Sequence, residues 1–309
     1  MKPFTRHRKR SVAALGEERL IAGIRQWLGK TNPPAPAGIG DDCAVLPAGS
    51  RLVTVDPVVF GRHFDHHLSP RDVGAKLLKR NLSDIAAMGG KPTAAVVGLL
   101  LSPDVKVEWL KEFYRGLASA ARRYGVAIVG GDVAQSGGKK VFSAHLTLLG
   151  NPATSRVLTR SGATIGDNLY VTGLLGNSLA SGHHHQFEPR LAAGAWLAGR
   201  KEVTAMMDVS DGLAKDVHAL VPPGGAASLF AAALPVRAGV TLKMALTDGE
   251  DYELLLAVSR DADLWRFELN FCRVFPDLPL TRIGRISPFR QLDPGAIKLE
   301  HYHGYAHLR

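Results

Sequence analysis

Acidic residues recur in this sequence where apolar runs end. The residues concerned are Asp41, Asp42, Asp56, Asp132, Asp208 and Asp211. Carboxylates that converge in one cleft repel one another unless divalent cations neutralise them, and hard oxygen ligands of this kind suit Mg2+ or Mn2+. Any single residue of this set could instead cap a turn or a helix. The set taken together favours a metal site, and magnesium in turn indicates a phosphate-bearing ligand.

The familiar nucleotide-binding loops are missing from the sequence. It contains no Gly-x-x-x-x-Gly-Lys-Ser/Thr loop, no protein-kinase combination of glycine loop and catalytic loop, and no Gly-x-Gly-x-x-Gly after a predicted strand. Bound ATP would therefore be held through metal ions, glycine backbone amides and an occasional arginine. Phosphoryl transfer needs little more, because it depends on positioning and charge neutralisation.

Helices and strands recur in both halves of the chain and would carry these residues. Apolar spacing and capping residues predict helices at Glu17–Leu28, from Pro70 to Gly89, at Val105–Tyr124 and near Arg190–Gly199. Strands are predicted at Arg51–Asp56, Thr93–Leu101, Val126–Val129, Lys140–Leu149, Asn168–Thr172 and Tyr252–Val258. The pattern restarts after Gly150, so we expect an N-terminal domain at residues 1–150 and a C-terminal domain at residues 151–309.

Length and composition favour a globular protein of the cytoplasm. At 309 residues the chain exceeds a typical domain of roughly 100–200 residues, and 46% hydrophobic residues can form a substantial core. The apolar run Ala94–Leu101 is far shorter than the roughly 20 residues that cross a bilayer. Ser11–Leu15 is too short for the apolar centre of a signal peptide. The short apolar runs predict no membrane partner. Cys43 and Cys272 lack metal-ligand spacing, so we expect both thiols to be reduced.

The net charge of +10 is concentrated at the N-terminus. The first ten residues carry five cations and no acid, which leaves about +5 for the rest of the chain. A basic chain favours anionic ligands, including phosphorylated metabolites. A basic head could also bind nucleic acid, but the other cations are scattered and no nucleic-acid-binding motif is present. We therefore expect residues 1–15 to be a disordered basic arm, with no nucleic-acid partner.

Six motifs occur in an order that resembles one enzyme family. They are Gly38–Leu46 (GIGDDCAVL), Asn81–Gly89 (NLSDIAAMG), Gly130–Ser136 (GGDVAQS), Leu158–Gly166 (LTRSGATIG), Met207–Leu213 (MDVSDGL) and Gly249–Leu254 (GEDYEL). Together they resemble the thiamine-monophosphate kinase family over nearly the whole chain. The resemblance implies an α/β (α+β), two-domain aminoimidazole ribonucleotide synthetase-like fold. In such a fold an N-terminal mixed sheet binds ATP and Mg2+ and forms a dimeric barrel, and a C-terminal α/β domain closes the active-site cleft.

The resemblance also implies roles for individual residues. Metal contacts are expected from Asp42, Thr54, Val55, Asp56, Asp84, Asp132, Asp208 and Asp211, of which Asp42, Asp84 and Asp208 are the catalytic ones. ATP contacts are expected from Gly131, Asp132, Arg160, Ser210 and, as a weaker candidate, Tyr114. Substrate contacts are expected from His63, Glu250 and Tyr305. Arg160 can fork onto a phosphate, and Tyr305 offers a flat face to a cationic heterocycle, although it could equally anchor the C-terminal segment.

The implied reaction transfers the γ-phosphoryl group of ATP to thiamine monophosphate, giving thiamine diphosphate and ADP, in a homodimer. The nucleophile is already an anion at neutral pH, so the main obstacle is repulsion between phosphates, which several Mg2+ ions would reduce. Direct in-line transfer without a phosphoenzyme is expected. Two alternatives stay open: another ATP-dependent enzyme of the same superfamily that acts on a different small phosphorylated metabolite, and a non-catalytic nucleotide-binding relative.

Three features depart from the family pattern. Val55 stands where the family usually has a hydroxyl residue, Asp248 replaces a glycine two positions before Glu250, and the segment 218–246 is short. These departures concern the substrate more than the metal centre. Separately, the run His183–His185 could bind a metal, but adjacent histidines led by serine and glycine are more typical of an exposed loop.

Overall fold

The computed structural model describes residues 11–15, 17–32 and 52–305, together with Thr5, His7 and Lys9. Asp41, Asp42 and Cys43 lie outside these residues. The chain divides into two compact units. Unit 1 comprises Met1–Leu82 and Pro92–Asn151, and unit 2 comprises Ser83–Lys91 and Pro152–Arg309.

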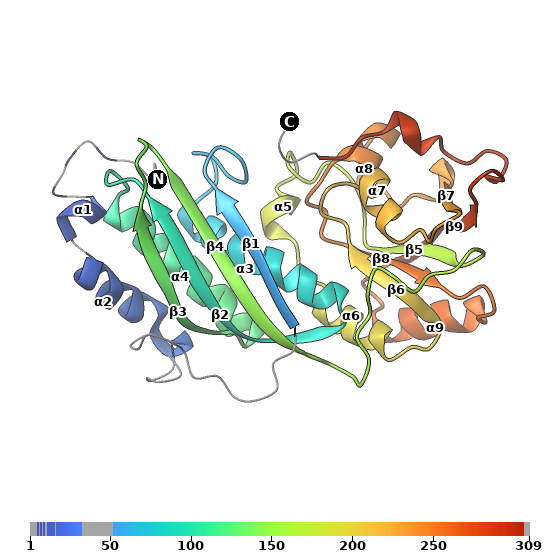
Figure 1. Ribbon diagram of the computed structural model, residues 1–309, viewed down its shortest axis with the longest axis horizontal. Helices are drawn as coiled ribbons and strands as arrows, with labels where there is room; N and C mark the ends of the chain where they lie inside the picture. The colour runs from blue at the N-terminus through green and yellow to red at the C-terminus, as the bar shows by residue number, and fades with distance from the viewer. Residues whose placement is uncertain are drawn as a thin grey trace. The chain divides into compact units, whose positions relative to one another are not determined.

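Unit 1 is built on a mixed four-stranded sheet (Figure 1). Its strands are β1 (Leu52–Val59), β2 (Gly90–Leu101), β3 (Ala127–Gln135) and β4 (Phe142–Pro152). Their order is β1-β4-β2-β3, with β1 antiparallel to β4 and β2 parallel to β3. The alternation predicted for β4 is confirmed, because Phe142, Ala144, Leu146 and Leu148 are all buried.

Two of the helix ends in this part of the chain have the predicted capping residues. The helices are α1 (Val12–Leu15), α2 (Glu17–Leu28), the 3-10 turn η2 (Gly29–Thr31), α3 (Pro70–Ala87) and α4 (Val107–Tyr124). Ser69 caps α3 as predicted, since its Oγ accepts the N–H of Asp72 at 3.2 Å. Gly125 ends α4 with φ +68°, also as predicted. Helices α3 and α4 cover one face of the sheet (Figure 1).

An aromatic cluster joins α4 to this sheet. The ring of Phe142 lies edge-on to those of Trp109 and Phe113, with centroids 4.6 and 5.4 Å apart. Phe64 stacks on Trp109 at 5.8 Å. These rings fill the layer between the sheet and its helices.

Two strands continue past the acidic residues that were predicted to end them. Strand β1 runs through Asp56 and Pro57 to Val59, and β3 runs through Asp132 to Gln135. The prediction that these acids mark strand ends is therefore wrong. Both strands lie at the edges of the sheet, where proline and polar side chains are tolerated.

Unit 2 contains a five-stranded sheet whose order is β6-β8-β5-β9-β7, and each pair of neighbouring strands is antiparallel. The strands are β5 (Asn168–Thr172), β6 (Val203–Asp208), β7 (Gly225–Leu229), β8 (Leu254–Val258) and β9 (Leu280–Pro288). The helices are α5 (His183–Gln186), α6 (Leu191–Ala198), α7 (Leu213–Asp216), α8 (Leu242–Thr247) and α9 (Leu264–Val274). Three 3-10 turns are η3 (Val217–Ala219), η4 (Ala231–Ala233) and η5 (Leu299–His301).

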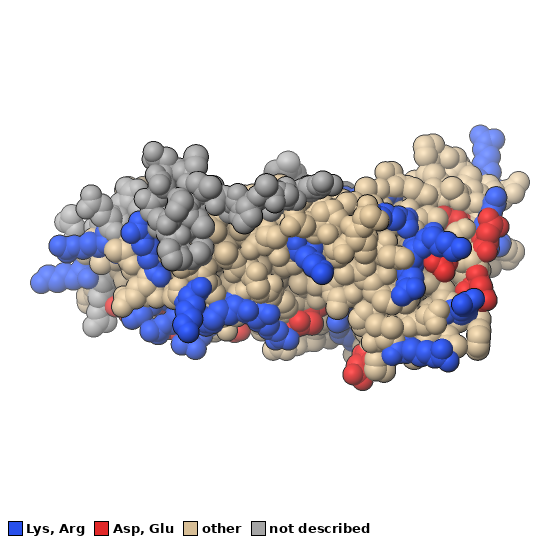
Figure 2. Space-filling model, turned by 90° about the horizontal axis from the view of Figure 1, so that it is seen from below, with Lys and Arg blue, Asp and Glu red and all other residues tan. Residues whose placement is uncertain are grey.

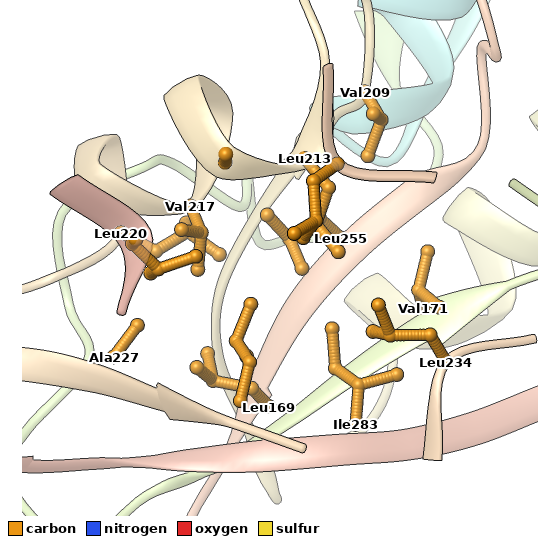
Figure 3. Packing of buried hydrophobic residues seen from close by; sticks show 14 of the residues in the cluster. Leu169, Val171, Val209, Leu213, Val217, Leu220, Ala227, Leu234, Leu255 and Ile283 are labelled. Atoms are coloured by element: carbon orange, nitrogen blue, oxygen red, sulfur yellow. The ribbon is translucent and has the colours of Figure 1, made fainter. Parts of the chain in front are cut away.

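Both faces of the unit 2 sheet are buried. Leu169, Val171 and Leu255 belong to the cluster shown in part in Figure 3, with residues of α7 and α8. The intervening Tyr170 and Leu256 belong to a second cluster, with residues of α6 and α9. A strand buried on both faces has no polar alternation, which explains the continuous apolar run of β8. The second cluster also contains Ala86 and Ala87 of α3, which is why Ser83–Lys91 belongs to unit 2.

The described surface is rich in basic side chains. On the face shown in Figure 2, Lys and Arg side chains form several separate groups, with Asp and Glu side chains among some of them. Within the described residues, no helix has the length and hydropathy that a bilayer crossing requires.

Candidate active site

The residues predicted to form the site divide between the two units. Unit 1 holds Thr54, Val55, Asp56, His63, Tyr114, Gly131 and Asp132. Unit 2 holds Asp84, Arg160, Asp208, Ser210, Asp211, Glu250 and Tyr305. Asp42 lies outside the described residues. Each unit therefore contributes its own partial set of carboxylates.

In unit 1, helix α3 orients Asp56. The N–H of Asp56 donates to Asn81 Oδ1 at 2.9 Å, and its carboxylate lies 3.4 Å from the guanidinium of Arg80. Arg80 also donates to the Pro57 carbonyl at 2.9 Å. The side chain of Asp56 is 28% exposed, whereas that of Arg80 is 10% exposed. The helix thus fixes the direction of a carboxylate at the surface of the unit.

Thr54 and Val55 lie on opposite faces of β1, because successive side chains of a strand alternate. Thr54 is partly buried on the same face as Asp56, and Val55 is 59% exposed on the other. Val55 has no side-chain oxygen, so only its backbone carbonyl could bind a cation.

His63 follows β1 in a turn that the same helix holds. Its Nδ1 accepts the N–H of Val59 at 3.0 Å, and its carbonyl accepts from Nζ of the buried Lys76 at 2.8 Å. A neutral His63 therefore carries its ring proton on Nε2. Helix α3 thus positions two of the predicted residues, Asp56 and His63.

Gly131 lies where β3 passes close to β2. A Cβ at Gly131 would come 2.1 Å from the carbonyl oxygen of Val97, so only glycine fits there. Gly131 and Asp132 are both exposed, and Asp132 pairs with Gly98 across the strands. This segment offers bare backbone beside a carboxylate, which a ligand can approach closely.

Tyr114 lies in the core of unit 1. Its side chain is 2% exposed and packs edge-on to Phe113, with ring centroids 5.4 Å apart. Burial raises the pKa of Tyr114. This placement favours a packing role, and we leave Tyr114 out of the proposed site.

In unit 2, Asp208 ends strand β6, as predicted for an acid after an apolar run. Its buried carboxylate accepts a hydrogen bond from Ser83 Oγ at 2.6 Å. Asp84 follows Ser83 directly. The bond therefore connects the end of α3, which carries one predicted metal ligand, to the loop that carries Asp208 and Asp211.

A single carboxylate organises that loop. Asp216 Oδ2 accepts the backbone N–H groups of Ser210, Asp211 and Gly212 at 3.0, 2.9 and 3.1 Å. Burial raises the pKa of Asp216 to about 6, although the N–H groups of Asp211 and Ser210 act in the opposite direction. Asp216 is not among the residues predicted from the motifs. The sequence feature that could have indicated Asp216 is an acid four residues after Gly212, close enough to accept the backbone N–H groups that precede a helix.

The loop that carries Glu250 is attached to the loop that carries Asp211. The N–H of Glu250 donates to the Ser210 carbonyl at 2.8 Å, and that of Tyr252 donates to the Val209 carbonyl at 2.8 Å. Glu250 and Tyr252 have φ values of +63° and +52°, which residues other than glycine rarely adopt. Strained backbone of this kind concentrates at functional sites. The two motifs therefore form one connected structure.

Asp248 holds the same loop from its other side. Its Oδ2 accepts the N–H of Asn177 at 2.8 Å, and Ser178 Oγ donates to the Gly249 carbonyl. Its φ of −70° is ordinary for any residue. The replacement of the family glycine therefore adds a contact without backbone strain.

Asp251 is buried beneath this loop. Its two carboxylate oxygens each lie 3.1 Å from the N–H of Gly176, and Oδ1 also accepts from Nη1 of Arg237 at 2.5 Å. Burial raises the pKa of Asp251 to about 6, although the Gly176 N–H and the Arg237 guanidinium act in the opposite direction. Asp251 therefore ties the loop to the rest of unit 2.

The three consecutive histidines are partly buried, so the prediction of an exposed loop is wrong. They form helix α5, in which His183 Nε2 lies 2.9 Å from the Asp251 carbonyl oxygen. His184 Nδ1 lies 3.6 Å from Glu250 Oε2. These partners are more than 60 residues later in the chain, and local sequence does not reveal them.

Arg160 and Tyr305 are exposed. Tyr305 has 47% of its surface accessible, and its N–H donates to the Asp211 carbonyl at 2.8 Å. Its backbone therefore anchors the C-terminal segment while its ring remains accessible.

The donor set fits magnesium in one particular way. Over the described ranges, no group of three or more His, Cys, Asp or Glu residues could hold a metal ion by itself. Magnesium is commonly bound by one or two carboxylates together with phosphate and water oxygens. Asp56 and Asp208 supply carboxylates whose orientations are set by Arg80 and Ser83. Each of these two carboxylates, taken in its own unit, suits a hydrated ion that also contacts phosphate.

Comparisons with known proteins agree with this architecture. Residues 40–151 match the family described as AIR synthase related protein, N-terminal domain. A thiamine-monophosphate kinase of Rhodopirellula baltica is 34% identical over 294 residues, which cover 87% of this chain and 89% of that protein. A thiamine-monophosphate kinase of Escherichia coli K12 is 33% identical over 306 residues, which cover 89% of this chain and 91% of that protein.

Solved structures show the same relationship. A thiamine-monophosphate kinase from Stenotrophomonas maltophilia K279a has 30% identity and a TM-score of 0.72, over 90% of this chain and 96% of that chain. AaThiL complexed with AMPPCP and TMP has 28% identity and a TM-score of 0.69, over 94% and 96%. The two sheets and the matched domain define an enzyme of the AIR synthase-related class. Within that class, the chain belongs to the thiamine-monophosphate kinase family.

The family and the fold class inferred from the motifs are therefore confirmed. The dimeric barrel and the roles of individual site residues stay predictions.

Proposed function

We propose that this protein transfers the γ-phosphoryl group of ATP to thiamine monophosphate. Support comes from the names of relatives with 33–34% identity over most of both chains. Further support comes from a related structure, at 28% identity, that is described as complexed with AMPPCP and TMP.

The observation that carries the proposal is the attachment of the Glu250 loop to the Asp208–Asp211 loop. Two backbone hydrogen bonds of 2.8 Å join them, so the predicted substrate contact and the predicted metal contacts of unit 2 are held in a fixed relationship. A phosphotransferase needs this, because acceptor and donor phosphates must be aligned to within a fraction of an ångström.

The chain's own residues would bind and orient the two substrates. We assign Arg160 and the Gly131 backbone to the ATP phosphates, and His63, Glu250 and the Tyr305 ring to thiamine monophosphate. Asp56, Asp84, Asp132, Asp208 and Asp211 would hold magnesium, together with Asp42, Thr54 and the Val55 carbonyl. When bound, magnesium supplies charge neutralisation between the phosphates. Transfer would be direct, because the acceptor is already an anion and needs no strong base.

Incubation of the purified protein with ATP, MgCl2 and thiamine monophosphate tests the proposal. Equal amounts of thiamine diphosphate and ADP are expected, with no phosphate left on the protein after ATP alone. The matched control is Asp261→Asn, a substitution at a side chain that is 88% exposed. Failure to form thiamine diphosphate while ATP binds would favour the alternative of a different small phosphorylated acceptor. Binding of ATP without any turnover would favour a non-catalytic relative.

We further propose that the protein is a homodimer formed through unit 1. Val53 and Val55 of the edge strand β1 are 64% and 59% exposed, and Leu100 of β2 is 38% exposed. Exposed apolar side chains on an edge strand favour association with a second copy. In this proposal the N-terminal domain, residues 1–150, serves both ATP binding and dimerisation.

We place the protein in the cytoplasm. The exposed free thiol of Cys272 suits a reducing compartment.

A further inference from the structure

The C-terminal segment Tyr302–Tyr305 lies on the loop that carries Asp211. Before this segment, Leu299 is buried in the core cluster shown in part in Figure 3, and Tyr302 packs against the same cluster. The chain then reaches the loop, where the N–H of Tyr305 donates to the Asp211 carbonyl at 2.8 Å. Packing of Leu299 and Tyr302 in the core of unit 2 thus places Tyr305 next to Asp211, one of the predicted metal ligands.

Lys215 joins the segment to this loop a second time. Its Nζ donates to the Tyr305 carbonyl at 2.9 Å and also to Asp211 Oδ2. Hydrogen bonds between an ammonium group and a carboxylate are stronger than those between neutral groups. Lys215 therefore connects a predicted metal ligand to the backbone of a predicted substrate contact.

The close approach of the two backbones requires Gly304. A Cβ at this position would come 2.3 Å from the Asp211 carbonyl oxygen and 2.8 Å from Cβ of Lys215. Contacts below 3.0 Å cannot form without a shift of the backbone. Any larger residue would therefore move Tyr305 away from the loop, independently of charge.

We propose that Lys215 is a positioning residue that holds the ring of Tyr305 in place for substrate binding. The inference rests on the proposed function, because it takes Tyr305 as a contact of thiamine monophosphate. It adds a residue that the motifs do not single out. Lys215 acts through the segment Tyr302–Tyr305 and does not itself touch the reacting atoms.

The test compares five full-length variants with the wild type. Lys215→Met removes both hydrogen bonds but keeps the length of the side chain, and Lys215→Arg keeps a cation. Gly304→Ala displaces the segment sterically, and the double variant Lys215→Met/Gly304→Ala combines both changes. Lys201→Met is the matched control, because Lys201 is an exposed lysine in a turn after α6.

Steady-state kinetics and hydrogen exchange are measured on each protein. For Lys215→Met and Gly304→Ala, we expect KM for thiamine monophosphate to rise about tenfold, which corresponds to loss of one or two hydrogen bonds. KM for ATP should stay within about twofold, since one substrate only is affected. The double variant should be no worse than the more severe single variant, and Lys215→Arg should restore most of the affinity.

Exchange of the Tyr305 amide reports on docking without any turnover. It should be faster in Lys215→Met and Gly304→Ala than in the wild type or Lys201→Met. Two results would overturn the inference and leave the proposed function intact. One is unchanged exchange of the Tyr305 amide in Lys215→Met. The other is an unchanged KM for thiamine monophosphate in Lys215→Met, measured when the wild type does make thiamine diphosphate. A wild type that makes no thiamine diphosphate removes the proposed function and the substrate part of this inference together.

Discussion

Arg190 donates two hydrogen bonds to the carboxylate of Glu253, from Nε to Oε2 at 2.7 Å and from Nη2 to Oε1 at 2.6 Å. Thr172 Oγ1 donates to the same carboxylate at 2.8 Å. Burial raises the pKa of Glu253, while the hydrogen bonds from Arg190 and Thr172 act in the opposite direction. Glu253 belongs to the motif Gly249–Leu254, so this pair anchors the Glu250 loop to the start of α6.

Arg190→Met should reduce the free energy of unfolding by roughly 3–5 kcal/mol, because it leaves a buried carboxylate without its partner. Chemical denaturation measures this change. Arg71→Met is the matched control, since it removes an ion pair with Glu112 whose arginine is 63% exposed, and it should cost less than about 1 kcal/mol. Equal losses in the two variants would mean that the Arg190–Glu253 pair is not an anchor.

Asp216→Ala should lower both stability and activity. It leaves three backbone N–H groups of the 210–212 loop without their acceptor, which predicts a loss of roughly 2–4 kcal/mol in unfolding free energy. We expect kcat to fall more than about tenfold, because the loop carries Ser210 and Asp211. Asp216→Asn keeps an acceptor oxygen and should be milder in both measurements. A fully active Asp216→Ala would show that the loop keeps its shape without this carboxylate.

Asp251 predicts a particular dependence of stability on pH. Its pKa is about 6 in the folded protein and near 4 in an unfolded chain, so the folded state holds more protons between these values. The stability contributed by this group is therefore full below about pH 4 and lost as the pH rises through about 6. Asp251→Asn cannot titrate, so the advantage of the wild type over the variant should shrink by up to roughly 3 kcal/mol from pH 4 to pH 7.

Urea denaturation of both proteins across this pH range measures that difference. Asp261→Asn serves as the control, and its difference from the wild type should stay constant with pH. A difference between the wild type and Asp251→Asn that is constant, or that grows with pH, contradicts the assignment.

Asp208→Asn should raise the magnesium concentration needed for activity and lower kcat by about a hundredfold or more. The substitution keeps the acceptor for Ser83 but removes the charge that a cation needs. Activity titrated with MgCl2, before and after treatment with a chelator, measures both effects. Ser83→Ala keeps the carboxylate and should cost less than Asp208→Asn, whereas the reverse order would place the metal elsewhere.

Val53→Glu should convert the proposed dimer into a monomer. The substitution places a charge beside the exposed Val55 on β1, where burial against a second copy would leave that charge unpaired. Light scattering coupled to size-exclusion chromatography measures the mass. Trp265→Glu, at a side chain of α9 that is 72% exposed, should leave the mass unchanged. A monomeric wild type would by itself refute the dimer.

Local signals predicted much of the fold. The bounds of α2 and β5 and the glycine end of α4 follow from apolar periodicity and capping, which depend on neighbours in sequence. The predicted strand Arg51–Asp56 ends too early, because an edge strand tolerates Asp56 and Pro57. Only the pairing of β1 with β4 shows that the strand continues to Val59.

The site was less predictable because its geometry depends on distant partners. The motifs named Asp208 and Glu250, but the hydrogen bond to Ser83 and the attachment of the two loops join residues up to 125 positions apart. Asp216 accepts backbone N–H groups of the loop and Lys215 donates to the backbone carbonyl of Tyr305, and backbone contacts leave little trace in residue type. The partly buried His183–His185 run was misjudged for the same reason.

Residues 83–91 complete the second unit although the rest of that unit begins only at Pro152, after the second part of the first unit. During synthesis on the ribosome, Ala86 and Ala87 emerge more than 60 residues before any other member of their cluster. Ala86 and Ala87 in the last turn of α3 therefore cannot pack into this cluster until the chain from Leu158 onward has been made. A gene split near residue 151 would separate that turn from its own core, so the two products would have to reassociate before the second unit could be whole.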